Sequence, residues 1–193
     1  MFNLNVTRMQ NISLSPHFEL QEFLVSPTAE KYCIDNTPAP ENVANLRSLC
    51  TYTLEPLREK MGLPIVITSG FRCKALNDIV SHRCHRSQHL QGQAADFYVG
   101  EGPVSGSKIQ DSSDLKHETG ESSLKPETPR QRLIRAFRLI LTSEKIDYDQ
   151  LILYRNFIHV SFVSHESNRH YIMKAEGNGR YARISKEVAL SLV

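Results

Sequence analysis

The segment that most constrains the fold is SQHLQGQAADFYV, residues 87–99, because it joins a polar stretch to an apolar, strand-like run. It places His89 seven positions before Asp96. Zinc prefers imidazole nitrogen and carboxylate oxygen, and catalytic zinc sites leave one coordination position to water. The segment therefore offers two candidate ligands for one metal ion. The residues between them include three small ones that let the chain turn and pack closely: Gly92, Ala94 and Ala95.

A third candidate ligand, His159, lies in the strand-like segment FIHVSF, residues 157–162. The two-residue period of a strand places Phe157, His159 and Ser161 on one face, with the more apolar side chains on the other. The side chain of a histidine on the less apolar face can point into a cleft. Spacing alone leaves open that His89 is an ordinary loop histidine and that His159 is a hydrogen-bonded strand histidine.

The order of the predicted elements indicates an α+β fold, with a small antiparallel sheet and helices packed on one side of it. One helix is expected to begin at Ser15 and Pro16. A second follows the Pro-rich residues 35–40, is divided at Pro56 and ends at Gly62. The remaining expected elements are strands at 65–68 and 94–99, helices at 72–80 and 131–149, strands at 150–154 and 157–162 joined by a tight turn at Arg155 and Asn156, and a tail with a strand, a turn at 177–180 and a terminal helix.

The domain organisation is predicted to be one domain over residues 15–193, preceded by an N-terminal arm at residues 1–14. Residues 100–130 are rich in Gly, Ser, Pro, Glu and Lys and contain no aromatic residue. Such a composition buries too little apolar surface to offset the entropy of ordering. We expect a disordered insertion within the domain, with a functional lid as the alternative.

Composition argues against several classes of partner. The net charge is only +2, which is too weak for a nucleic-acid binder. No apolar run is long enough for membrane insertion, and no signal peptide is recognisable, so a cytoplasmic monomer is expected. The four cysteines are expected to be free thiols: Cys33, Cys50, Cys73 and Cys84. The alternative for Cys84, which stands between His82 and His85, is that its thiolate binds a metal ion.

Three motifs together resemble a known family. Residues 87–96 match the pattern S-x-H-x-x-G-x-A-x-D of the zinc D-Ala-D-Ala carboxypeptidase superfamily. ITSGFRC at residues 67–73 is similar to the S-G-[FY]-R segment of that superfamily, and FIHVSF resembles its last zinc-histidine strand. The superfamily includes phage L-alanyl-D-glutamate endopeptidases, and it shares its fold with the signalling domain of hedgehog proteins. The resemblance runs from about Ser15 to Asn168 and implies a bacterial or prophage origin.

The resemblance implies one Zn²⁺ ion held by His89, Asp96 and His159. It implies that Arg72 holds a substrate carboxylate or stabilises charge on the attacked carbonyl, since a guanidinium can bond two oxygens. Ser87 would support the site by hydrogen bonding, and His85 is a candidate for the substrate cleft. The expected activity is a metallopeptidase that hydrolyses peptidoglycan peptides at or near a D-amino acid, released to the cell wall through a phage-type pore.

One position departs from the family pattern. Many members carry Asp or Glu three residues before the last zinc histidine, and this chain has Asn156 there. An amide cannot act as a general base. The base then lies elsewhere, with nearby candidates Glu101, Asp147, Asp149 and Tyr154, or the chain is slow or inactive. A metal-containing module that binds cell-wall peptides is therefore the alternative function, followed by a protein-interaction domain.

Overall fold

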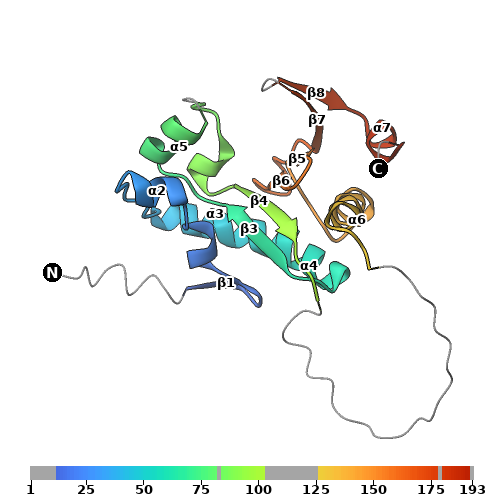
Figure 1. The fold of residues 1–193 in the computed structure, drawn as a ribbon, viewed down its shortest axis with the longest axis horizontal. Coiled ribbons are helices and arrows are strands. Elements are labelled where there is room, and N and C mark those ends of the chain that lie inside the picture. The colour runs from blue at the N-terminus through green and yellow to red at the C-terminus, as the bar shows by residue number, and fades with distance from the viewer. Residues whose placement is uncertain (1–11, 82–83, 103–125, 178–179, 192–193) are drawn as a thin grey trace, which may run out of the picture.

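The computed structural model describes residues 12–81, 84–102, 126–177 and 180–191, which form a six-stranded sheet, a small two-stranded sheet and surrounding helices (Figure 1). The strands of the large sheet lie in the order β3-β4-β6-β5-β7-β8. Their bounds are β3 Ile65–Ser69, β4 Ala94–Val99, β5 Gln150–Leu153, β6 Ile158–Ser161, β7 Tyr171–Gly177 and β8 Arg180–Ile184.

The large sheet is mixed, which corrects the prediction of an antiparallel sheet. β7 pairs with β5 in parallel, whereas the other four pairings are antiparallel. The reason is that β4 and β5 already occupy both edges of β6. The chain reverses direction after β6, and β7 joins the free edge of β5, along which it runs parallel. The α+β class itself is confirmed.

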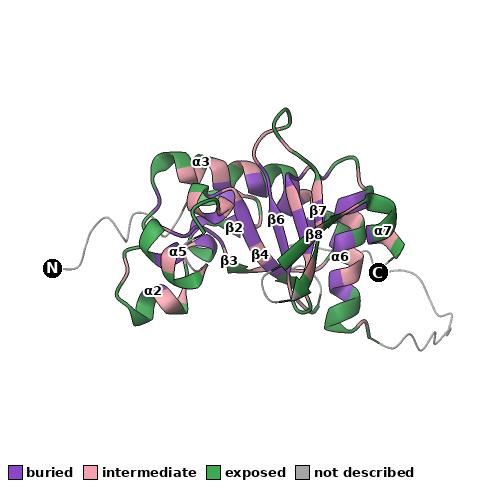
Figure 2. Ribbon diagram, turned by 90° about the horizontal axis from the view of Figure 1, so that it is seen from above, coloured by how far each residue is buried: buried purple, intermediate pink, exposed green. Residues whose placement is uncertain are grey.

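The hydrophobic core lies between one face of the sheet and a group of helices. Alternate residues of β4, namely Ala95, Phe97 and Val99, join the same buried cluster as residues from α3, α4 and α6. Buried residues accordingly gather along β4 and β6 (Figure 2). The bounds of these helices are α3 Pro40–Leu49, α4 Glu55–Met61 and α6 Pro129–Thr142. The residues that alternate with the core positions, Asp96 among them, face the other way.

Not all described helices lie against that face. α2 (Pro27–Lys31), α5 (Lys74–Val80) and the 3₁₀ helix η3 (Gln88–Gln91) pack near one another instead, and Figure 1 shows α2 and α5 beyond the ends of β3 and β4. The prediction of helices on one side is therefore incomplete. This second group matters for the site, because η3 carries His89.

The predicted helix start at Ser15 is wrong. Strands β1 (Ser13–Ser15) and β2 (Phe18–Glu19) form a hairpin there, followed by the 3₁₀ helix η1 (Leu20–Phe23). The buried carboxylate of Glu55 accepts hydrogen bonds from the Ser15 hydroxyl and the His17 backbone N–H and pairs with the His17 ring. This partner, about 40 residues further along the chain, favours a turn over a helix.

The helix after the Pro-rich stretch is divided, as predicted. A π-helix η2 (Cys50–Leu54) separates α3 from α4, because Pro56 cannot donate a backbone hydrogen bond. Gly62 ends α4 with φ +62°, in the left-handed region. The long helix α6 begins at Pro129 and is capped by Thr128, whose hydroxyl accepts from the Gln131 N–H. It ends at Thr142, seven residues before the predicted end at 149. The short terminal helix α7 (Lys186–Ser191) is also present.

The predicted arm and insertion lie largely outside the described residues, namely at 1–11 and 103–125. The described ends of both segments belong to the fold. Leu14 is buried, Gly100 donates a backbone hydrogen bond to Pro64, and Arg132 of α6 pairs with Glu101. None of the described helices has the length and apolarity that crossing a membrane requires.

Gly92→Ala tests the tight packing behind η3. Gly92 has φ +69°, and an added Cβ would lie 2.5 Å from the backbone oxygen of Asn42. Gly62 is the matched control, since it has φ +62° and open space around its Cβ position. Each substitution should cost about 1–2 kcal/mol for the left-handed backbone. Gly92→Ala should cost about 1–3 kcal/mol more, because of the steric clash. Urea unfolding measures both, and equal losses would contradict the packing described here.

Candidate metal centre

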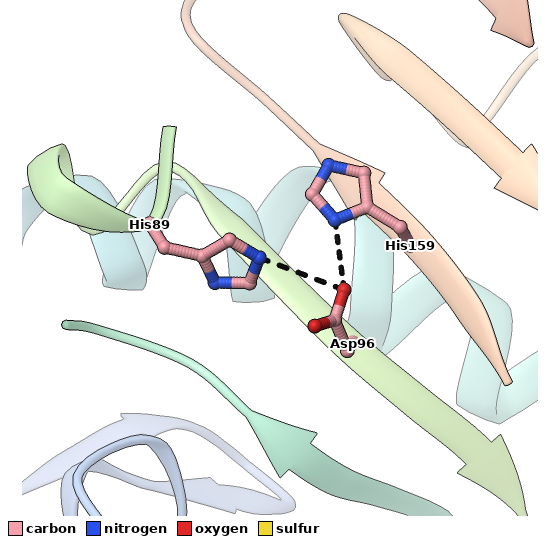
Figure 3. A group of neighbouring side chains, drawn as sticks. All are labelled: His89, Asp96 and His159. Atoms are coloured by element: carbon pink, nitrogen blue, oxygen red, sulfur yellow. Dashed lines mark hydrogen bonds and ion pairs between the residues drawn. The ribbon is translucent and has the colours of Figure 1, made fainter. Parts of the chain in front are cut away.

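Three polar side chains from separate segments converge on one point (Figure 3). Asp96 of β4 and His159 of β6 are direct partners in the antiparallel ladder, so both side chains leave the same face of the sheet. His89 reaches the same point from η3. In the described parts of the chain this is the one group of His, Cys, Asp or Glu that could hold a metal ion, with its ligand atoms within 4.8 Å of one another.

The helix η3 is held in place from several directions. Asn42 and Asn45 of α3 donate side-chain hydrogen bonds to the carbonyls of Leu90 and Gln91. The backbone N–H of Arg72 donates to the carbonyl of His89 at 3.1 Å. The imidazole of His89 is therefore presented by a short element that is anchored to both α3 and the segment after β3.

The tautomer of His89 follows from its contact with Gly70. His89 Nδ1 lies 2.6 Å from the Gly70 carbonyl oxygen, and a carbonyl can only accept a hydrogen bond. Nδ1 therefore carries the proton. Burial lowers the pKa of His89 by more than Asp96 raises it, so the ring is neutral at pH 7 and Nε2 has a free lone pair.

Asp96 faces that lone pair as an anion. Burial raises the pKa of Asp96, but other interactions, among them the hydrogen bond with His159, lower it by more, so the net pKa lies below its ordinary value. Its Oδ1 lies 3.5 Å from His89 Nε2 and 2.8 Å from His159 Nδ1. A carboxylate oxygen opposite an imidazole lone pair repels it unless a cation lies between them. The group thus fits a cation, and two imidazole nitrogens with one carboxylate oxygen are ligands that Zn²⁺ takes.

Arg72 holds the second oxygen of Asp96. Its guanidinium donates to Asp96 Oδ2 at 3.2 Å, to the Ser69 hydroxyl at 3.0 Å and to the Ser81 hydroxyl at 2.7 Å. These contacts use three of its five N–H donors, and the side chain is buried. Arg72 therefore fixes the carboxylate with Oδ1 toward the histidines and retains donors for a further anionic group.

A buried carboxylate outside the converging group, Asp149, supports η3. Asp149 is fully buried, and it accepts hydrogen bonds from the Gln88 side chain at 2.8 Å and from the backbone N–H of Arg169 at 2.8 Å. The Arg169 guanidinium pairs with the same carboxylate. Gln88 precedes His89 in η3, so this network ties the histidine-bearing element to the start of β5. Sequence reasoning considered Asp149 only as a base and missed Gln88 and Arg169.

Other predicted site residues lie apart from this group. Ser87 is the half-buried residue preceding η3, and its side chain makes no capping hydrogen bond. His85 and Cys84 are exposed, and neither belongs to the converging group. Asn156 is exposed in the turn between β5 and β6. His82 lies outside the described residues.

The acidic candidates for a general base have other partners. Asp149 is enclosed by its network, Asp147 accepts hydrogen bonds from His165 and His170, and Glu101 pairs with Arg132. The phenol of Tyr154 is different, because it interacts electrostatically with both Arg72 and Asp96. Tyr154 is therefore close enough to Arg72 and Asp96 to interact with both.

A family model described as Peptidase M15 matches residues 16–125, which is more than half of the chain. The matched part contains Arg72, His89 and Asp96, and it ends before His159. No curated protein matches the chain.

Asp149→Asn tests the hydrogen-bond network of Gln88, Asp149 and Arg169. The substitution removes the charge that faces Arg169 and should lower the free energy of unfolding by about 2 kcal/mol, which is less than for a fully buried pair because Arg169 is half-exposed. Burial raises the pKa of Asp149, but its hydrogen bonds with Arg169 lower it by more. The stability difference between wild type and variant should thus be full above about pH 4 and shrink as the pH falls further. Urea unfolding at pH 7 and pH 3 measures this, and a pH-independent difference would contradict it.

Proposed function

The chain belongs to the M15 family of peptidases, and we propose that it is a zinc-dependent metallopeptidase that hydrolyses peptidoglycan stem peptides at or near a D-amino acid. The observation that carries this proposal is the convergence of two imidazole nitrogens and one carboxylate oxygen within 4.8 Å on one face of the sheet. The ligand atoms are His89 Nε2, Asp96 Oδ1 and His159 Nδ1. The chemistry of this donor set and the family support each other.

Zinc, when bound, would polarise the scissile carbonyl and acidify an attacking water. The surrounding residues prepare the site for the ion. Gly70 sets the tautomer of His89 and leaves Nε2 free, and Arg72 orients the carboxylate of Asp96. Such outer hydrogen bonds fix the ligands before the metal arrives and raise its affinity.

The remaining donors of Arg72 suit a substrate carboxylate or the oxyanion of the attacked amide. In the reaction, water adds to the carbonyl carbon, the C–N bond breaks, and the proton from water passes to the departing amine. We assign Ser87 a supporting role next to η3, and we place His85 at the rim of the substrate cleft. A substrate with a free carboxyl end would be held by Arg72 as a carboxypeptidase requires, and an internal bond would be cleaved without that contact.

Asn156 favours a second candidate function. The amide at this position cannot accept the proton of water. A chain that holds zinc without an efficient base would bind cell-wall peptides and turn them over slowly or not at all. The two functions share the metal site and differ only in turnover.

Metal binding is the first prediction for this site. Zinc at 100 times its Kd should stabilise the folded protein by about 2.7 kcal/mol. His89→Ala and His159→Ala should each abolish stoichiometric zinc binding, because each removes one of three ligands. His165→Ala is the matched control, a histidine that also pairs with an aspartate but lies outside the group. Metal analysis and thermal unfolding measure these effects, and a wild-type protein without zinc-dependent stabilisation would contradict the metal site.

Turnover is the second prediction. Mass spectrometry should detect cleavage of a D-Ala-D-Ala-terminated stem peptide or of an L-Ala-D-Glu-containing peptide by the zinc-loaded chain. A chelator should abolish cleavage, and zinc should restore it. Zinc-dependent binding of these peptides without products would favour the binding module, and the identity of the cleaved bond separates carboxypeptidase from endopeptidase.

A further inference from the structure

Tyr154 lies on the same face of the sheet as the converging group. It follows β5 and continues the ladder with β6, since its backbone N–H donates to the Phe157 carbonyl at 3.0 Å. The rings of Tyr154 and Phe157 stack, with centroids 4.2 Å apart and planes at 15°. Phe157 and His159 share a face by the two-residue period. Tyr154 is thus the diagonal neighbour of His159, at a separation of about 7–8 Å that aromatic side chains can span.

The position of the Tyr154 side chain is fixed at both ends. Arg130 of α6 donates a hydrogen bond to the Tyr154 carbonyl at 2.7 Å, which holds the backbone of the turn. The Tyr154 hydroxyl lies 2.8 Å from the hydroxyl of Tyr181 on β8. The ring is therefore held between the stacked Phe157 and Tyr181, with its phenol on the face that carries Asp96.

The protonation state of this phenol decides what it can do. Burial raises the pKa of Tyr154, and the hydrogen bond with Tyr181 raises it further. The phenol therefore keeps its proton at neutral pH. It cannot replace the missing carboxylate at Asn156 as a base, but it can donate a hydrogen bond to an anion.

We propose that Tyr154 is a catalytic residue that donates a hydrogen bond to the oxyanion formed when the scissile carbonyl is attacked, and that Tyr181 is the residue that positions it. This inference rests on the proposed peptidase function. Tyr154 and Arg72 then approach the oxyanion as the two donors supplied by side chains of this chain. The three motifs contain neither Tyr154 nor Tyr181.

The hydrogen bond between the Tyr154 and Tyr181 hydroxyls keeps the Tyr154 O–H paired when no substrate is bound. Each phenol has one proton and can also accept a hydrogen bond. Without substrate, the Tyr154 hydroxyl donates to Tyr181. When an oxyanion forms, rotation about the two C–O bonds lets Tyr181 donate to Tyr154 while Tyr154 donates to the oxyanion. The number of hydrogen bonds rises by one, and no proton changes its oxygen.

Kinetics of the zinc-loaded full chain provide the first arm of the test. Tyr154→Phe should lower kcat by about 10²–10³-fold, as the loss of one oxyanion donor does elsewhere, with KM changed by less than about threefold. Tyr181→Phe should lower kcat by a smaller factor, because Tyr154 remains. The matched control is Tyr171→Phe, whose ring keeps its contacts with Arg169 and Arg183. A Tyr154→Phe enzyme with the kcat of wild type would overturn the proposal.

A binding arm works whether or not peptides are turned over. The probe is a phosphinate analogue of D-Ala-D-Ala, in which a tetrahedral anion replaces the scissile amide. Tyr154→Phe should weaken its binding by about 10–100-fold, the loss expected for one hydrogen bond to a charged group. Zinc content and the unfolding midpoint should match wild type, which shows that the variant folds. Equal affinity for wild type and Tyr154→Phe would overturn the role of Tyr154 alone. A wild-type chain that neither binds the analogue nor cleaves peptides would overturn the peptidase function and this inference with it.

Discussion

The ionised carboxylate of Asp96 is the interaction on which the site depends. It is largely enclosed, it faces the lone pair of a neutral His89, and it receives one hydrogen bond from His159 and one from Arg72. A buried anion is costly unless charges and donors surround it. Arg72 compensates the negative charge on Oδ2, and Oδ1 faces the two imidazoles. A divalent cation between these three atoms would complete the compensation, and the metal-site proposal is built on this balance.

Three elements of the fold bring these atoms together. The antiparallel pairing of β4 with β6 sets Asp96 opposite His159, and η3 brings His89 across to them. The left-handed backbone of Gly92 lets the chain turn directly from η3 into β4, against α3. The buried Asp149 ties Gln88 of η3 to β5 and to Arg169. Tyr154 follows β5 of the same sheet, on the face that carries Asp96 and His159.

Much of this was predictable from local patterns, and the rest was not. The period of FIHVSF placed His159 on the correct face, and Pro56 and Gly62 marked the division and end of the helix after residue 40. Prediction failed where a distant partner decides. Glu55 binds residues of the hairpin at 13–19, β4 occupies the edge of β6 that β7 would otherwise join, and Gln88 contacts Asp149 61 residues later. The guanidinium of Arg72 was expected to face the substrate. Its additional hydrogen bond to Oδ2 of Asp96 depends on the register of the sheet and was not predicted. No local pattern encodes these contacts, because each requires the finished fold.

The most direct measurement of the central claim is the position of a bound zinc ion. Crystals of the zinc-loaded chain, recorded at the zinc absorption edge, should give one anomalous peak. It should lie about 2.0–2.2 Å from His89 Nε2, Asp96 Oδ1 and His159 Nδ1, with a fourth position open to solvent. A peak elsewhere, or none among these atoms at saturating zinc, would contradict the account.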